Sequence, residues 1–132
     1  MNHRMDDLVQ WLRDRLDDDE RIARGACWDD QSDEWSARPP QKSYERYCVV
    51  DYLDDGVVAV TPENADPDGV GQHVARHDPA RVLREVESKR RVSARILNHA
   101  AVMGWDEVHG DVLRSLALPY ADRPGYLEEW RP

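Results

Sequence analysis

The sequence predicts a small α+β protein in which a hairpin or three-stranded antiparallel sheet packs with two long helices and a short C-terminal helix. Two long segments repeat apolar residues at helical spacing, and a segment between them is rich in Tyr and Val around an Asp-Gly turn. A chain of 132 residues can bury one core but is short for two. We therefore expect a single domain over residues 1–132.

The first element is a helix predicted over residues 6–26, because Leu8, Leu12 and Leu16 recur at four-residue steps. A carboxylate cluster lies on the outer surface of this helix: Asp14, Asp17, Asp18, Asp19 and Glu20. Such a cluster is either a solvated helix face or a surface that a protein partner recognises, including a mimic of nucleic-acid phosphates.

The sheet is predicted from residues 44–61, in which Tyr and Val dominate two runs. The residues between these runs, 53–56, read Leu-Asp-Asp-Gly and favour a hairpin turn. Since a two-stranded hairpin is only marginally stable alone, we expect a third strand near Trp35. Residues 62–71 are rich in Pro, Gly and Asp and predict an acidic loop.

Two further helices are predicted over residues 79–103 and 106–118. Asp78 is the expected N-cap of the longer helix, because Pro79 suits the first helical position and a carboxylate there accepts a backbone amide of the first turn. Gly104 is a natural stop for the same helix.

Charge is unevenly distributed along the chain. The net charge is −9, yet residues 72–99 carry +4. Four arginines fall close to one face of the long second helix and form a basic strip: Arg81, Arg84, Arg91 and Arg95. Glu87 stands four residues before Arg91, the favourable order for an intrahelical ion pair. The remaining positive charge is expected to pair with the acidic first helix or to bind an acidic partner, whereas the acidic remainder argues against nucleic acid as a partner.

The C-terminal tail holds Tyr120, Tyr126 and Trp130. These rings either line a shallow aromatic binding cleft or pin the tail onto the domain in place of further core. The second role is favoured, because the chain contains no Phe and needs large rings to fill its interior.

His73 and His77 are four residues apart and could bind a metal together with Asp78. Metal sites require three or four ligands, and nothing in the sequence completes the set. The sequence instead favours a packing role for His77 beside the helix start. No nucleophile, phosphate-loop or dinucleotide motif is present, so we predict no catalytic residue and no cofactor.

Cys27 and Cys48 lack the spacing of a metal or redox pair, and no segment is apolar over the roughly 18 residues of a membrane span. We therefore expect a reduced, cytoplasmic protein. The leading hypothesis is a non-enzymatic binding protein, with a helix-mediated homodimer as one arrangement. The alternative is a small metal- or ligand-binding protein, with hydrolysis left open, that uses His73, His77 and Asp78.

Two segments together carry a family resemblance: HVARHDPARVLREVESKRR at residues 73–91 and LRSLALPYADRPGYLEEWRP at residues 113–132. They resemble an uncharacterised family of actinobacteria and their phages, domain of unknown function 6221. The similarity extends from Asp-Leu-Val-Gln-Trp-Leu near the N-terminus to the final Trp-Arg-Pro. The resemblance implies a cytoplasmic bacterial or phage setting, and it implies no activity. Within that setting, the leading hypothesis of a binding protein becomes an accessory or regulatory factor.

Overall fold

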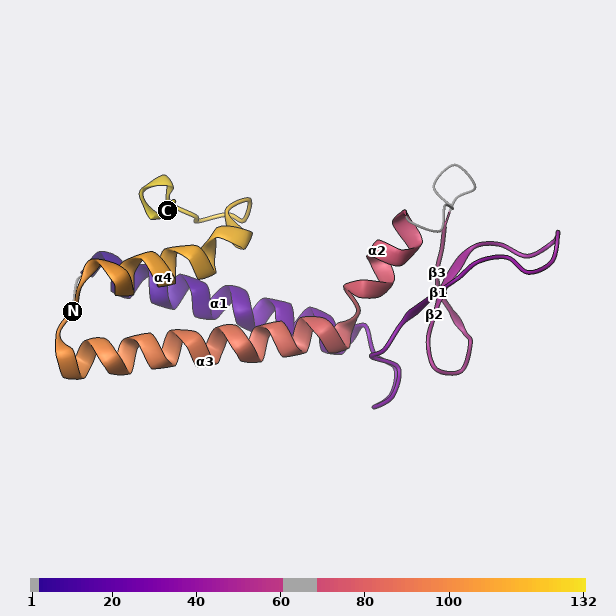
Figure 1. The fold of residues 1–132 in the computed structure, drawn as a ribbon, viewed down its shortest axis with the longest axis horizontal. Helices are drawn as coiled ribbons and strands as arrows, with labels where there is room; N and C mark the ends of the chain where they lie inside the picture. The colour runs from indigo at the N-terminus through magenta and orange to yellow at the C-terminus, as the bar shows by residue number, and fades with distance from the viewer. Residues whose placement is uncertain (1–2, 61–68) are drawn as a thin grey trace. The chain divides into compact units, whose positions relative to one another are not determined.

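The structure is a computed structural model that describes residues 3–60 and 69–132 (Figure 1). Its helices and small antiparallel sheet confirm the predicted α+β class. The chain divides into two compact units, one formed by residues up to Asp19 with Glu85–Pro132, the other by Glu20–Arg84. None of the helices in the described ranges is long and apolar enough to span a membrane.

In chain order the described elements are α1 (His3–Gly25), β1 (Ser36–Arg38), β2 (Cys48–Val50), β3 (Gly56–Ala59), α2 (Val70–Arg76), α3 (Pro79–Met103), α4 (Glu107–Ala117), and the 3-10 helices η2 (Leu118–Tyr120) and η3 (Glu128–Trp130). The three predicted helices are therefore confirmed, and the predicted range of the second matches α3 at both ends. Gly104 follows α3 with φ +87°, a conformation that ends a helix and favours glycine.

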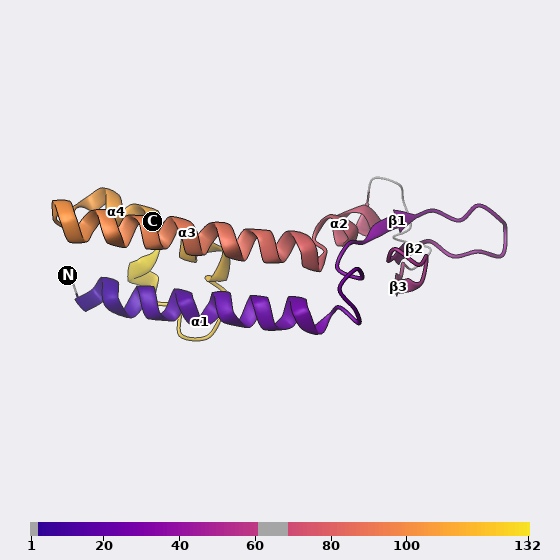
Figure 2. The same cartoon turned by 90° about the horizontal axis from the view of Figure 1, so that it is seen from below.

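In the first unit, α1 and α3 run side by side in opposite directions in both views (Figures 1 and 2). The predicted apolar stripe of α1 is confirmed, since Leu8, Leu12 and Leu16 are at most 1% exposed. Arg90 of α3 donates to the Asp17 carboxylate of α1 at 2.8 Å. Burial of the leucine stripe thus holds the helix pair together, and the Arg90–Asp17 ion pair crosses its polar side.

The start of α4 is fixed by an aspartate and a buried histidine. The Asp106 carboxylate accepts from the amides of Val108 and His109, and Nδ1 of His109 accepts from the Asp106 amide at 3.0 Å. Because Nδ1 is an acceptor, the ring hydrogen lies on Nε2, which is 2.9 Å from Nδ1 of His99. His109, 3% exposed, therefore serves as a reciprocal cap inside the core.

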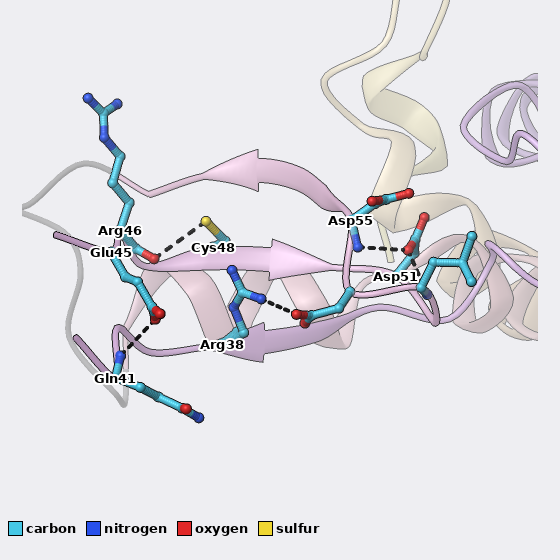
Figure 3. A network of polar contacts seen from close by, with 9 residues as sticks. Arg38, Gln41, Glu45, Arg46, Cys48, Asp51 and Asp55 are labelled. Carbon is cyan, nitrogen blue, oxygen red and sulfur yellow. Dashed lines mark hydrogen bonds and ion pairs between the residues drawn. The ribbon is translucent and has the colours of Figure 1, made fainter.

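In the second unit, the antiparallel sheet has the order β1-β2-β3. The predicted hairpin is confirmed as β2 and β3, and the strand expected near Trp35 is β1. Figure 3 shows Arg38 of β1 paired with a carboxylate, which belongs to Asp54 in the β2–β3 turn. All four residues of β3 are exposed.

The predicted loop over residues 62–71 is partly wrong. Residues 61–68 lie outside the described ranges, but Val70 and Gly71 already belong to α2. This helix is only seven residues long, so its stability depends on tertiary packing rather than on helix propensity. It packs against β1 and β2.

Candidate anion-binding site

A cleft of about 560 Å³ lies between β1, α2 and the first turns of α3, within the Glu20–Arg84 unit. Three guanidinium side chains line it, from Arg76 at the end of α2 and from Arg81 and Arg84 in α3. We call this cavity the arginine cleft. Its volume falls in the range typical of ligand sites.

Asp78 is the one carboxylate among the described residues that line the cleft. The prediction that it caps α3 is confirmed, because its Oδ1 accepts from the Arg81 amide at 2.8 Å. Its Oδ2 accepts from the Trp35 amide at 3.1 Å. Both oxygens of Asp78 thus accept from backbone donors.

Trp35 also lines the cleft. The Trp35 ring is held by Nε1, which donates to the Ser32 carbonyl at 3.1 Å. Ser32 is itself 1% exposed, and its hydroxyl accepts from the amides of Trp28 and Asp29. The hydrogen-bonded turn around Ser32 therefore fixes the position of the Trp35 side chain.

The floor of the cleft includes Tyr47, which is 3% exposed. α2 packs onto this ring at Gly71, where an added Cβ would lie 2.2 Å from Cε1 of Tyr47. Only glycine therefore permits this approach of α2 to the sheet without displacing the ring. Ala37 and Ala75 also line the cleft.

The predicted basic strip is divided by the fold. Arg81 and Arg84 line the cleft, whereas Arg91 and Arg95 do not. Arg91 forms the predicted ion pair with Glu87 at 3.1 Å, and Arg95 is exposed. Arg76, which the sequence did not single out, completes the cationic group.

The cleft arginines differ in how far they are engaged. Nη1 of Arg81 donates to the Arg76 carbonyl at 3.4 Å. The guanidinium groups of Arg76 and Arg84 form no hydrogen bond or ion pair with the described residues, and both side chains are exposed. The cleft therefore presents at least two cations that are available to an incoming anion.

The carboxylates of the acidic cluster of α1, by contrast, form hydrogen bonds or ion pairs with other residues of the protein. Asp17 accepts from Arg90, and Asp19 accepts from the Tyr120 hydroxyl at 2.8 Å. The others are engaged by neighbours in the same helix: Asp14 by Gln10, Asp18 by Arg15, and Glu20 by Arg24. These contacts disfavour α1 as a row of free carboxylates spaced like phosphates.

The aromatic tail pins itself onto α1, as the favoured prediction stated. The rings of Tyr126 and Trp130 lie 5.6 and 5.5 Å from the ring of Trp11, and Nε1 of Trp11 donates to the Pro124 carbonyl. Tyr120 and Trp130 are 5% and 3% exposed. Their faces are buried in the core and offer little surface for stacking against a nucleic-acid base.

The histidine site proposed from sequence is not assembled. The rings of His73 and His77 are 4.4 Å apart and both side chains are exposed, so the expected packing role of His77 is wrong. Asp78, the third candidate ligand, is occupied by the cap described above. Within residues 3–60 and 69–132, no group of three or more His, Cys, Asp or Glu side chains is arranged to hold a metal ion.

A second cavity of about 390 Å³ is lined by Trp28, Trp35 and Asp51 among others. Asp51 is 6% exposed, and the hydrogen bond from Nε1 of Trp28 to its carboxylate lowers the pKa of Asp51. Tyr52 stacks on Trp28 and donates to Asp29, and this hydrogen bond raises the pKa of Tyr52 to about 12. These carboxylates are satisfied by donors of the protein itself.

Comparison with known proteins gives one match. Residues 5–132 match the model of a family of unknown function (DUF6221). No curated protein and no solved structure matches the chain. The chemistry of the arginine cleft must therefore be argued from its own residues.

Proposed function

The chain belongs to this family of unknown function, and we propose that it is a non-enzymatic accessory or regulatory binding protein that acts through contacts with a partner protein. An actinobacterial or phage origin and a cytoplasmic setting are part of the proposal, supported by the sequence motifs. The observation that carries the proposal is the arginine cleft, a concentration of positive charge in a protein of net charge −9.

The electrostatics of the cleft favour an anionic partner. The guanidinium groups of Arg76 and Arg84 share one cavity and repel each other, and an anion placed between them relieves that repulsion. Clefts lined by one sign of charge also focus the field and raise the rate of encounter with oppositely charged groups. An acidic segment of a partner protein is thus the natural complement of this surface.

The proposal is tested by affinity capture from a native host lysate, with and without nuclease, read by mass spectrometry. We expect a protein partner that the wild-type chain captures even after nuclease treatment. Arg84→Glu should abolish capture, because it reverses an exposed charge inside the cleft. Arg95→Glu is the matched control, since Arg95 is an exposed arginine of the same helix outside the cleft.

Recovery of nothing but nucleic acid would overturn the proposal. Equal loss of capture in both variants would also count against it, because that result would place the contact outside the cleft. Circular dichroism of the two variants shows whether either substitution disturbs the helices.

A further inference from the structure

We infer that a second site binds the guanidinium group of an arginine side chain of a partner protein. The site is the cavity of about 390 Å³ whose lining includes Trp28, Trp35, Asp51 and Asp55, and we call it the tryptophan pocket. All four residues belong to the Glu20–Arg84 unit. This site lies outside the proposed function, because its cavity is a different one and its ligand carries the opposite charge.

The tryptophan pocket carries negative charge without a cation in its lining. The described residues that line it include the carboxylates of Asp51 and Asp55 and no Lys, Arg or His. Asp51 accepts hydrogen bonds from Nε1 of Trp28 and from two backbone amides of the β2–β3 turn. These donors are neutral, so they engage the oxygens of Asp51 but leave its charge in the pocket.

The carboxylate of Asp55 is available to an incoming cation. Asp55 is exposed, and its side chain forms no hydrogen bond or ion pair with the residues that the structure describes. Figure 3 shows Asp55 beside Asp51, with its backbone amide bonded to the Asp51 carboxylate. Arg38, a cation that reaches the same turn, pairs with Asp54 instead. A cation in the pocket would therefore lie near two carboxylates and relieve their mutual repulsion.

The two indoles favour a guanidinium group over an ammonium group. Trp28 is 61% exposed and stacks on Tyr52 with ring centroids 6.0 Å apart, so its side chain is held in place and still open to solvent. Trp35 is fixed by its hydrogen bond to the Ser32 carbonyl. A guanidinium group is planar and weakly hydrated, stacks on aromatic rings and donates a fork of N–H groups to a carboxylate, whereas an ammonium group is a strongly hydrated point charge. The pairing of indoles with a carboxylate therefore matches arginine.

The same charges indicate that the arginine is part of a polypeptide. Free arginine carries its own α-carboxylate, and no cation in the described lining offsets the repulsion of that group by Asp51 and Asp55. An arginine residue within a chain has a neutral amide in that place. Val57 lines the pocket and is 38% exposed, and Leu53 in the adjoining turn is 53% exposed. The residues that flank the arginine in a partner can cover this apolar surface.

The test titrates the full chain with small probes and follows the indole N–H signals of its five Trp residues by NMR. The probes are N-acetyl-arginine amide, N-acetyl-citrulline amide, N-acetyl-lysine amide and free arginine. We expect the arginine amide to shift the signals of Trp28 and Trp35. It should bind at least about tenfold more tightly than the citrulline amide, which has nearly the same shape but no charge, and more tightly than the lysine amide and free arginine.

Substitution of one carboxylate tests the assigned site. Asp55→Asn should weaken binding of the arginine amide at least about fivefold, because it removes the carboxylate that accepts the fork. Asp30→Asn is the matched control, since Asp30 is an exposed aspartate of the same unit that does not line the pocket. Both variants lose the same charge, and circular dichroism checks that both remain folded.

Equal affinity for the arginine and citrulline amides would overturn the inference, as would shifts confined to the other indoles. Tighter binding of the lysine amide or of free arginine than of the arginine amide would also overturn it, since the ligand is then an ammonium group or a free amino acid. Equal weakening in Asp55→Asn and Asp30→Asn would count against the site, because long-range charge alone would then explain the binding. None of these results involves the cleft arginines, so the proposed function is decided separately by the capture experiment.

Discussion

The hydroxyl of Tyr120 donates to the carboxylate of Asp19 at 2.8 Å, and this bond joins the end of η2 to the C-terminal half of α1. Nζ of Lys89 in α3 donates to the same hydroxyl at 3.3 Å. A single buried tyrosine therefore links three helical elements that are distant in sequence.

Tyr120→Phe should lower the free energy of unfolding by about 1–3 kcal/mol, because it removes a bond to a charged group and leaves Asp19 without that donor. Urea denaturation followed by tryptophan fluorescence measures the change. Tyr44→Phe is the control, since Tyr44 is 77% exposed. Equal stability of the two variants would mean that the Tyr120–Asp19 bond contributes nothing.

The same tyrosine predicts a loss of stability in alkali. Burial raises the pKa of Tyr120, and the hydrogen bond to Asp19 raises it further. The folded value lies above the ordinary value of about 10, so this contribution is complete below that pH and is lost as pH rises through the folded value. The alkaline decline in stability of the wild-type chain should be less steep in Tyr120→Phe.

Gly125→Ala should destabilise the tail by about 1–3 kcal/mol, because Gly125 has φ +89° and an added Cβ would lie 2.8 Å from Nε1 of Trp11. Thermal unfolding followed by circular dichroism checks this result. Gly25→Ala at the end of α1 serves as the comparison, since a Cβ there meets nothing within 4 Å. A melting temperature of Gly125→Ala equal to that of wild type would contradict the turn described here.

Gly71→Ala should weaken capture of the partner protein even though all three arginines remain. The new methyl group displaces Tyr47 from the floor of the cleft, and overpacking of this kind costs about 1–3 kcal/mol. Affinity capture at a temperature where the variant is folded separates binding from stability. Gly56→Ala, which meets nothing within 4 Å, should bind like wild type. Undiminished affinity in Gly71→Ala would show that Tyr47 does not shape the site.

Tyr52 should ionise near pH 12, because its hydroxyl donates to Asp29. Asp29→Asn removes the negative charge and should return the pKa of Tyr52 towards its ordinary value of about 10. The difference between ultraviolet titrations of each protein with and without Tyr52→Phe isolates this residue from the other tyrosines. An unchanged titration in Asp29→Asn would disprove the contribution of that carboxylate.

Local sequence rules predicted those parts of the fold that depend on neighbouring residues. Asp78 and Pro79 define the start of α3, and Gly104 defines its end, because capping and left-handed backbone are decided within a few residues. The three-stranded sheet followed from one hairpin signal and the need for a third strand. α2 was missed because seven residues, two of them small, carry no helical stripe long enough to recognise.

Only some of the residues of the candidate site could be identified from the sequence. Arg81 and Arg84 were identified as members of a basic strip, but the strip was drawn along one helix, whereas the cleft recruits Arg76 from α2 and Trp35 from the segment before β1. The bond between the Trp35 amide and Asp78 spans 43 residues. No local pattern encodes a contact between residues so far apart in sequence. The position of Trp35 beside a predicted strand was the one local signal that could have pointed to this contact.

The contact of Trp11 with Trp130 has a consequence for the order in which the chain acquires structure. The unit that holds these two rings is assembled from both ends of the sequence, whereas the unit that holds the arginine cleft is one continuous segment, Glu20–Arg84. During synthesis the continuous segment has all of its contacts available before the last third of the chain exists. Trp11 of α1 lacks its contacts with Tyr126 and Trp130 until the final residues have been synthesised, and closing so long a loop makes that step the slower one.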